Sequence, residues 1–362
     1  MSLPSDTDIL VVGGGLAGLR LAEQLTQAGR DVQLVEARDR HGGRILSVEA
    51  QGAHFDLGPA WFWDGQPRMA ALAHDLGLQV FEQFSRGDAR FEDQRGRLQQ
   101  GRGIGSMQGS FRISGGLGAL TDGLAARIPD DRVHLNTQFS GLSQNTQGLQ
   151  ATLADGTQIH AQHVVLALPP RIAAGLAFSP ALSPAALQAM TNTPTWMAGQ
   201  AKALMIYDRP FWRDMGLSGD AMSQIGPMVE IHDASPVEGT PGALFGFIGV
   251  PPAHRQDKAA LDAALRQQVA RLFGPDAPEP QDVIVKDWAE TRWTATERDL
   301  APLTAHPRYG LAAALNGLWE GRLHFGNTEV APGFGGFLEG ALEAADAVFH
   351  KIATPERRRL QI

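Results

Sequence analysis

The chain has 362 residues, which is long enough for two domains with sizeable hydrophobic cores. Its hydrophobic content of 43% and charged content of 19% are typical of a globular enzyme, and its net charge of −8 argues against nucleic acid or an anionic membrane as a partner. The absence of cysteine excludes disulfides, thiolate metal sites and cysteine nucleophiles. No run of about 18 apolar residues is present and the amino terminus is short and polar, so we expect a cytoplasmic protein.

The amino terminus carries the pattern of a dinucleotide-binding fold. Residues 9–12 form a continuous apolar run, as in a strand buried on both faces, and residues 16–28 are predicted to be helical. Three glycines in and after the intervening turn allow a tight turn, close approach of a pyrophosphate and close packing of the helix. They are Gly13, Gly15 and Gly18. A second strand, residues 31–36, ends at Glu36, where a carboxylate accepts hydrogen bonds from ribose hydroxyls and disfavours a 2′-phosphate.

The next segment, residues 36–44, adds two glycines and three arginines directly after this acid. Arginine supplies planar, permanently charged donors for a diphosphate, and paired glycines keep the backbone close enough to donate as well. Here the chain resembles the flavin-containing amine oxidase family, which includes monoamine and polyamine oxidases. Its members carry the glycine motif, the E-A-R-D-R-x-G-G-R run and a D-x-G-x-x-W segment, here residues 56–61. The resemblance implies FAD rather than NAD, and without cysteine the flavin is expected to be non-covalent unless a histidine or tyrosine forms the bond.

A second glycine-rich stretch, residues 326–329 and 335–341, resembles the family's carboxy-terminal flavin motif, G-T-E followed by G-Y-x-E-G-A. Asn327 and Phe337 replace the usual threonine and tyrosine. A helix beginning near Gly336 would direct its unpaired amides and the positive end of its dipole at the flavin pyrimidine edge.

The resemblance implies the following FAD-binding residues. They are Gly13, Gly15, Leu16, Ala17, Gly18, Glu36, Ala37, Arg38, Gly42, Gly43, Arg44, Gly58, Pro59, Ala60, Trp61, Phe139, Trp288, Asn327, Glu329, Gly336, Phe337 and Leu338. Phe139 stands where a backbone amide would read the adenine, but it is equally consistent with a core residue. Trp288, in the family's W-x-x-E segment, would lie near the flavin or in the core.

Lys202 is the candidate catalytic residue. It lies in the apolar run 201–207, before a Pro-Phe-Trp segment, and in the family such a lysine hydrogen-bonds a water near flavin N5. A buried lysine is costly unless its charge is satisfied or its pKa falls. The alternative is that Lys202 points outward from an edge strand.

The expected substrate pocket has lost part of the aromatic cage of monoamine oxidases. Glu297 and Arg298 stand where the family has a cysteine or small residue and an aromatic residue. An inward Arg298 would repel a cation and favour a carboxylate, whereas an outward one would lie on the surface. The candidate pocket residues are Trp61, Trp293, Arg298, Phe334 and Phe337, with Trp196 as a further wall. His54, His306 and His324 show no triad or ligand spacing, so neither a general base nor a metal site is expected.

The predicted fold class is α/β, with a Rossmann-like FAD-binding domain and a second, α+β substrate domain. The FAD-binding domain comprises residues 1–66, 113–171 and 316–362, and the substrate domain comprises residues 67–112 and 172–315. Residues 133–168 are expected to be β structure with a hairpin turn at Asp155 and Gly156. The polar segment 87–105 is predicted to be a loop or surface hairpin, and residues 259–273 an amphipathic helix.

The resemblance implies hydride transfer from a carbon bearing nitrogen to flavin N5, with hydrolysis of the resulting imine. The substrate would be an amine or amino acid, and dioxygen or another acceptor would reoxidise the flavin. Three alternatives remain open. They are oxidation of carbon–carbon bonds, as in the related protoporphyrinogen oxidases and carotenoid desaturases, a dehydrogenase that passes electrons to a quinone or protein, and a flavin-binding module without turnover. The oligomeric state is also open.

Overall fold

A computed structural model describes residues 3–102, 105, 107–301, 303 and 305–353. The chain divides into two compact units. The first comprises Met1–Gly43, Leu120–Trp196 and His306–Ile362, and the second comprises Arg44–Ala119 and Met197–Ala305. Residues at both ends of the predicted FAD-binding domain, 1–2 and 354–362, lie outside the described residues. No helix in the described part of the chain is long and apolar enough to cross a membrane.

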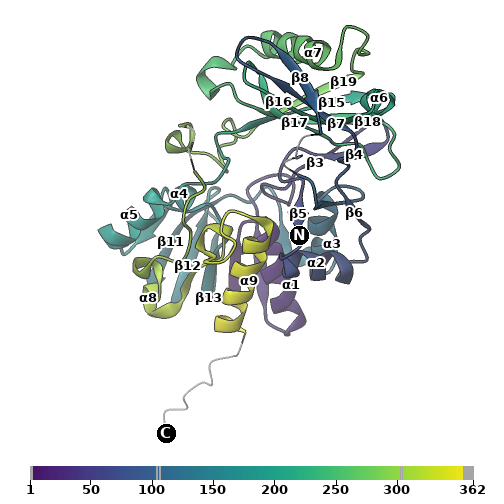
Figure 1. Cartoon of the computed structure of the whole chain (residues 1–362). Helices are drawn as coiled ribbons and strands as arrows, with labels where there is room; N and C mark the ends of the chain where they lie inside the picture. The colour runs from purple at the N-terminus through teal and green to yellow at the C-terminus, as the bar shows by residue number, and fades with distance from the viewer. Residues whose placement is uncertain (1–2, 103–104, 106, 302, 304, 354–362) are drawn as a thin grey trace. The chain divides into compact units, whose positions relative to one another are not determined.

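The first unit is built on an eight-stranded sheet with a parallel centre (Figure 1). Strand β1 (Asp6–Val12) pairs in parallel with both β2 (Val32–Val35) and β13 (Gln158–Leu166). Strands β10 (Val133–His134) and β20 (Leu323–Phe325) extend the parallel part beside β2 and β13. The apolar residues of β1 from Ile9 to Val12 are almost fully buried. The predicted strand, buried on both faces, is therefore confirmed.

Three more strands follow on the other side of β13. They are β12 (Gly148–Leu153), which is antiparallel to β13, β11 (Phe139–Asn145), which is antiparallel to β12, and β14 (Ala177–Ser179), which is parallel to β11. The predicted hairpin between β12 and β13 is present, and Asp155 Oδ1 accepts a hydrogen bond of 2.9 Å from Thr157 N within its turn. Helices α1 (Leu16–Gln27) and α9 (Leu338–Ile352) lie side by side in this unit (Figure 1).

The shorter elements connect these strands and helices. In the first unit they are η1 (Asp130–Arg132), α4 (Pro170–Ala173), α5 (Pro184–Asn192), η4 (Ala313–Leu315), α8 (Leu318–Gly321) and η5 (Thr328–Val330). Helix α3 (Gly118–Ala125) contains the boundary between the two units at residues 119 and 120.

The second unit is built on a seven-stranded sheet. In spatial order its strands are β19 (Asp282–Asp287), β15 (Ala201–Tyr207), β18 (Gly242–Ile248), β17 (Met228–Asp233), β16 (Leu217–Ser223), β7 (Asp88–Glu92) and β8 (Leu98–Gly101). Helix α7 (Lys258–Phe273) lies along this sheet (Figure 1), and its Leu265 and Val269 share a core with Ala203 and Met205 of β15. The remaining elements are β3 (Ser47–Ala50), β4 (Ala53–Asp56), β5 (Phe62–Trp63), α2 (Pro67–Asp75), β6 (Val80–Glu82), β9 (Ser110–Ile113), α6 (Phe211–Asp214), η2 (Pro252–His254) and η3 (Glu297–Asp299).

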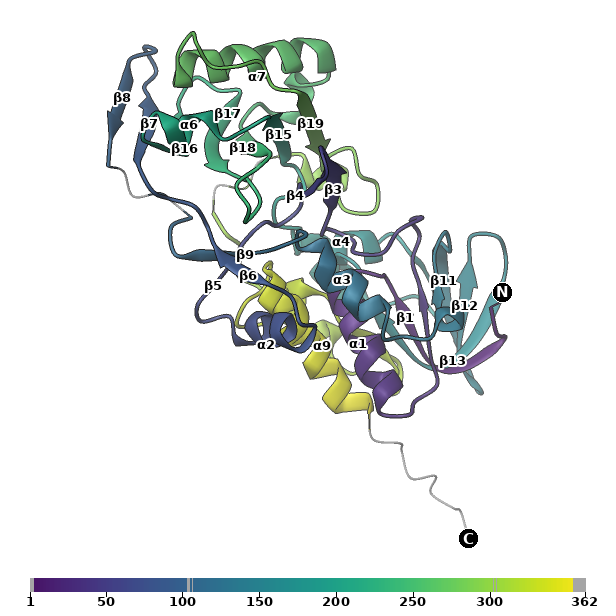
Figure 2. The same ribbon diagram turned by 90° about the vertical axis from the view of Figure 1, so that its right-hand side faces the viewer.

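Residues 103 and 104 of the predicted loop or surface hairpin 87–105 lie outside the described residues. The rest of the segment contains the β7–β8 hairpin, which lies at one edge of this sheet (Figure 2). Its polar composition suits an edge strand, because all four residues of β8 are exposed. Strands β16 and β17 are not predicted from the sequence. Gly219 and Gly226 interrupt the alternation of apolar residues there, and β16 also pairs with β7, which lies far earlier in the sequence.

The two compact units do not coincide with the predicted domains. Residues 172–196 belong to the first unit because β14 pairs with β11 and because Ala186 and Met190 are buried in the core of that sheet. Residues 44–66 belong to the second unit because Phe55 is buried with Leu204 and Phe245. An apolar pattern predicts that a segment is buried but not which of two cores it joins. The assignment of these segments to functional domains stays a prediction.

Candidate functional site

The turn after β1 forms an anion-binding position at the start of α1. The helix is capped by Gly15 without a side-chain hydrogen bond, and its first turn contains no acidic residue. Its unpaired amides and positive dipole end therefore favour a negatively charged group. A Cβ at Gly18 would collide with the carbonyl oxygen of Gly13, so the helix packs on the turn only because residue 18 is glycine. Strand β1 lies between β2 and β13, which is the kind of topological switch point where open α/β sheets bind ligands.

Glu36 lies next to this turn at the end of β2. It is 4% exposed, and its carboxylate accepts hydrogen bonds from Gly14 N at 2.8 Å and from Arg38 N at 3.0 Å. Arg38 Nη1 also lies 3.3 Å from the carboxylate. A carboxylate has about four lone-pair directions, so Glu36 keeps the capacity to accept from a ribose hydroxyl.

The arginine- and glycine-rich segment, residues 36–44, packs against the turn that follows β1. Gly42 N donates to Gly14 O at 2.7 Å, and a Cβ at Gly43 would lie 3.1 Å from Gly15 Cα. Arg40 holds the segment by donating to Gly43 O at 3.0 Å. The two glycine segments thus build a single cradle whose inner surface is backbone.

The carboxy-terminal motif places a second helix start in the same unit. Helix α9 follows Phe337, which caps it without a side-chain hydrogen bond. Thr328 Oγ1 accepts from Gly336 N at 2.9 Å and donates to Phe337 O at 2.8 Å, which fixes this turn. Asn327 is 1% exposed, and its Oδ1 has no hydrogen-bond partner among the described residues. A buried acceptor without a donor is costly, so the position suits a bound group that carries an N–H or O–H.

The cradle residues and Asn327 therefore fit a dinucleotide with a polar ring system. Four other predicted cofactor-binding residues are buried, which is consistent with a role through their backbone or through packing. They are Leu16, Ala17, Glu329 and Leu338. Ala37 is only half-buried. Phe139 is 6% exposed and packs in the apolar core of the sheet with Leu142, so the core alternative describes its side chain.

An aromatic group surrounds the start of α9. The ring of His306 stacks on Phe337 with centroids 5.0 Å apart and an interplanar angle of 19°. The same imidazole meets Trp196 at 4.9 Å and Tyr309 at 5.5 Å in edge contacts. Phe337 is nevertheless 39% exposed, and Phe334 is half-buried. The sequence predicts that Phe337 and Trp196 line the substrate pocket. It gives no signal that the ring of His306 would pack against both of them.

Lys202 is buried in the second unit. Strand β15 is an interior strand between β19 and β18, so the alternative of an edge strand does not hold. The side chain is 6% exposed and donates to Gly58 O, and its ammonium lies 5.6 Å from the ring of Phe245 and 5.4 Å from that of Phe247. Burial lowers the pKa of Lys202 to about 7, against the opposing effect of the Asp56 carboxylate.

Asp56, the first residue of the D-x-G-x-x-W segment, is a buried acid whose charge acts on Lys202. Its carboxylate accepts from Ser47 Oγ at 2.5 Å and from Leu117 N at 2.9 Å. Burial raises the pKa of Asp56 to about 6, and the hydrogen bond from Ser47 and the charge of Arg112 partly oppose that rise. The sequence places this aspartate in the D-x-G-x-x-W motif but does not predict its effect on Lys202.

Two tryptophans fix the segment that follows Asp56. Trp61 Nε1 donates to Gln83 Oε1 at 2.8 Å, and Trp288 Nε1 donates to Leu57 O at 2.9 Å. Trp61 is 7% exposed and Trp288 is 4% exposed. Gly58 packs against the backbone of Arg44, and the neighbouring Pro59 and Ala60 are half-buried and buried, respectively.

The other predicted pocket residues of the second unit, Trp293 and Arg298, differ in their exposure. Trp293 is half-buried with the guanidinium of Arg292 4.2 Å from its ring centroid, and Arg298 is exposed on the short helix η3. His54 is exposed, and His324 lies 3.2 Å from a ring nitrogen of His163. Burial, together with the charges of His163 and Lys351, lowers the pKa of His324 to about 4. Among the described residues no group of histidine and acidic side chains could hold a metal ion.

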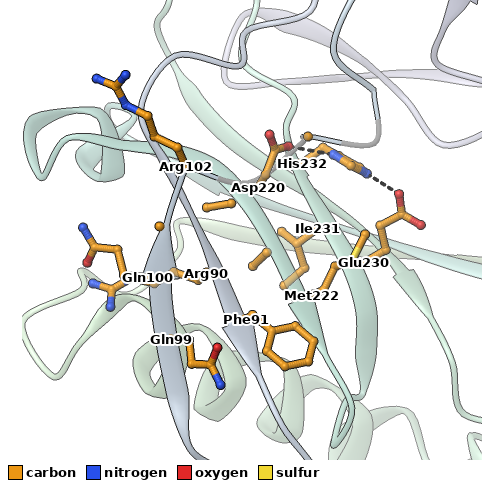
Figure 3. Close-up of a pocket in the computed structure, with 14 residues that line it drawn as sticks. Arg90, Phe91, Gln99, Gln100, Arg102, Asp220, Met222, Glu230, Ile231 and His232 are labelled. Carbon is orange, nitrogen blue, oxygen red and sulfur yellow. Dashed lines mark hydrogen bonds and ion pairs between the residues drawn. The ribbon is translucent and has the colours of Figure 1, made fainter.

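The second unit also contains a pocket of about 310 Å³ between β7, β8, β16 and β17 (Figure 3). His232 lies between Asp220 and Glu230 at one side of it. Sequence reasoning did not single out these three residues. The i, i+2 spacing of Glu230 and His232 would have placed them on one face of a strand, but only if β17 had been recognised.

Comparisons with known proteins agree with this geometry. The family model described as "Flavin containing amine oxidoreductase" matches residues 16–105 and 102–348. The chain is 23% identical to the probable flavin-containing monoamine oxidase A of Dictyostelium discoideum, over 95% of this chain and 97% of that protein. It is also 23% identical to the putrescine oxidase of Kocuria rosea, over 84% of this chain and 87% of that protein.

Solved structures show the same fold. Putrescine oxidase bound to putrescine superposes with a TM-score of 0.81 at 20% identity, covering 96% of this chain and 99% of that chain. Cyclohexylamine oxidase from Brevibacterium oxydans IH-35A superposes with a TM-score of 0.80 at 18% identity, with coverage of 96% and 99%.

The family match covers most of the chain, and the predicted α/β flavoprotein fold is confirmed. FAD is the cofactor that this family implies, and the sequence offers no cysteine for a thioether link to it. The chain belongs to the flavin-containing amine oxidoreductases and is an FAD-dependent oxidoreductase.

Proposed function

We propose that this protein oxidises the C–N bond of a small amine and passes the electrons to dioxygen. The observation that carries the proposal is Lys202, a buried lysine whose pKa lies near neutral pH beside the segment that resembles the family's flavin motif. When bound, FAD supplies the hydride acceptor for the carbon that bears the nitrogen.

Each group of residues has a distinct task in the proposal. The amides at the start of α1 and the glycine cradle bind the diphosphate, and Glu36 accepts from the ribose. The amides and the positive dipole end at the start of α9 would favour an electron-rich edge of the bound flavin. Lys202 holds a water by hydrogen bonding, and the exposed ring of Phe337 offers a π surface to the amine.

The named relatives support an amine over the alternatives. The relatives include a putrescine oxidase and a monoamine oxidase, and the structural neighbours include a cyclohexylamine oxidase. Oxidation of carbon–carbon bonds gains no support from these names. An amino acid substrate would gain support from an inward Arg298, but Arg298 is exposed.

The test is anaerobic mixing of the FAD-loaded protein with primary amines, followed by addition of oxygen. We expect amines to bleach the oxidised flavin spectrum, and oxygen to restore it with formation of hydrogen peroxide. Replacing Lys202 by methionine should slow turnover at least about tenfold, because a positioned hydrogen-bond donor is lost. Lys258→Met, which removes an exposed lysine paired with Glu290, is the matched control and should turn over like the wild type. Failure of every amine to bleach the flavin contradicts the proposal, and bleaching without peroxide contradicts dioxygen as acceptor.

A further inference from the structure

The imidazole of His306 lies against the start of α9 in the first unit. Its ring stacks on Phe337 with centroids 5.0 Å apart, and it makes edge contacts with Trp196 and Tyr309. A Cβ at Gly336 would lie 2.9 Å from His306 Nε2, so this nitrogen adjoins the backbone of the carboxy-terminal glycine motif. His306 is therefore a neighbour of two residues that the sequence predicts to bind FAD, Gly336 and Phe337.

The ring nitrogens of His306 are free of hydrogen bonds to the residues that the structure describes. The side chain is exposed and is held in place by its ring contacts. Tyr309, the other titratable ring of the group, donates its hydroxyl to Pro194 O at 2.8 Å. The charged residues of the adjoining segments are Arg308, which is exposed, and Glu339, which is buried in the first turn of α9. A neutral imidazole keeps one nitrogen as an acceptor, so His306 has a lone pair available for a proton.

Oxidation of a C–N bond requires that the amine loses the proton with which it arrives. An alkylammonium has a pKa like that of lysine, about 10.4, so only about one molecule in a few thousand is neutral at pH 7. The π surface of Phe337 also attracts the charged form. The charged form has no lone pair on nitrogen to assist departure of the hydride from the neighbouring carbon. An imidazole changes its charge within the ordinary working range of pH, so it is suited to accept this proton and to return it to solvent.

We infer that His306 is a catalytic base, which takes a proton from the substrate ammonium held at the ring of Phe337. The N–H bond of the ammonium breaks, its electron pair stays on the amine nitrogen, and the proton forms an N–H bond on the imidazole. The hydride then leaves the carbon that bears this nitrogen, and the exposed imidazolium releases its proton to solvent. The inference rests on the proposed function, because it needs an amine substrate. It assigns to His306 a role that the sequence does not predict.

The experiment measures anaerobic flavin reduction by butylamine and by benzylamine in the FAD-loaded protein at pH 7 and at pH 10. His306→Phe keeps an aromatic ring on Phe337 but removes both nitrogens. The readout is the second-order rate constant of the wild type divided by that of the variant. We expect a ratio of about ten or more at pH 7, because a general base is lost, and a ratio of about two or less at pH 10, where much of the amine is already neutral. His254→Phe, which replaces an exposed histidine of η2, is the matched control and should give a ratio near one at both pH values.

His306→Gln, which loses both the ring and the basic nitrogen, should show the same dependence on pH. A ratio near one at pH 7 for His306→Phe overturns the inference, and so does a large ratio that is equal at both pH values, because a purely structural role would behave in that way. If no amine reduces the wild-type flavin, the proposed function fails. Nitrogen-15 spectra of histidine-labelled protein then decide the inference, with His306→Phe to assign the signals of His306. At pH 7, tert-butylamine, which has no hydrogen on the carbon that bears nitrogen, should shift these signals toward imidazolium, and unchanged signals overturn the inference.

Discussion

At the scale of single residues, burial shifts the pKa values of Lys202 and Asp56 toward neutral pH. Burial raises the pKa of Asp56 to about 6 and lowers that of Lys202 to about 7, while each charge favours the other. The protonation of both side chains therefore changes within the range of pH at which an enzyme commonly works. This sensitivity requires a lysine on a strand whose two faces are both buried, which β15 provides.

The lowered pKa of Lys202 predicts a defined dependence of stability on pH. Between pH of about 7 and the unperturbed value of 10.5, the unfolded chain binds a proton at Lys202 that the folded chain does not. The free energy of unfolding therefore rises with pH across this range. Relative to Lys202→Met, the wild type should gain on the order of 3 kcal/mol between pH 7 and pH 9.5, at about 1.4 kcal/mol per pH unit.

Urea denaturation of the FAD-loaded proteins at several pH values measures this gain. Lys258→Met is again the control, because that lysine is exposed and should leave the pH dependence of the wild type intact. Parallel curves for wild type and Lys202→Met would show that the lysine stays charged when buried. Any constant offset between the two curves reflects the lost contact with Gly58 O and does not bear on the prediction.

At the scale of elements, the start of α1 depends on a backbone contact that no side chain tolerates. The helix lies against the turn of β1 so closely that a Cβ at Gly18 would meet the carbonyl oxygen of Gly13. Gly42 and Gly43 then close the other side of the same turn. The position of the helix amides, and with it the anion site, follows from glycine at these points.

Gly18→Ala should therefore displace α1 from the turn and weaken FAD binding at least about tenfold, since the helix amides lose their alignment with the diphosphate. The measurement is the dissociation constant of FAD for protein stripped of flavin and reconstituted, with circular dichroism as a check of folding. Gly175→Ala in the same unit is the control, because its Cβ would lie 3.5 Å from Ile172 O, an ordinary contact. A folded Gly18→Ala variant with the FAD affinity of the wild type would refute the proposed role of this contact.

At the scale of the whole molecule, the sequence predicts best what is encoded locally. The strand, turn, helix and acid of the first 36 residues, the β12–β13 hairpin and the amphipathic helix α7 all depend on neighbours in sequence, and all are present. The α/β class follows from these segments, whereas the flavoprotein fold and the FAD cofactor are implied by the resemblance of the two glycine motifs to those of the flavin-containing amine oxidase family. The apolar run 201–207 indicates that Lys202 is buried, although the sequence leaves open a lysine that points outward from an edge strand.

Features that depend on distant pairing could not be predicted in this way. The pocket in the second unit exists because β16, which pairs locally with β17, also pairs with β7, a strand that lies far earlier in the sequence. The stack of His306 on Phe337 joins residues 31 positions apart that share no motif. Residues 44–66 and 172–196 likewise belong to the unit whose core buries their apolar side chains, and the sequence does not show which core that is.

The most direct measurement of the central claim is the absorption spectrum of the purified protein before and after acid precipitation. We expect a flavin spectrum in the native protein and, after precipitation, a colourless pellet with FAD in the supernatant. Flavin that stays with the pellet would contradict the non-covalent cofactor and point to a bond through histidine or tyrosine. A colourless protein that takes up no FAD on reconstitution would contradict the assignment of the two glycine motifs altogether.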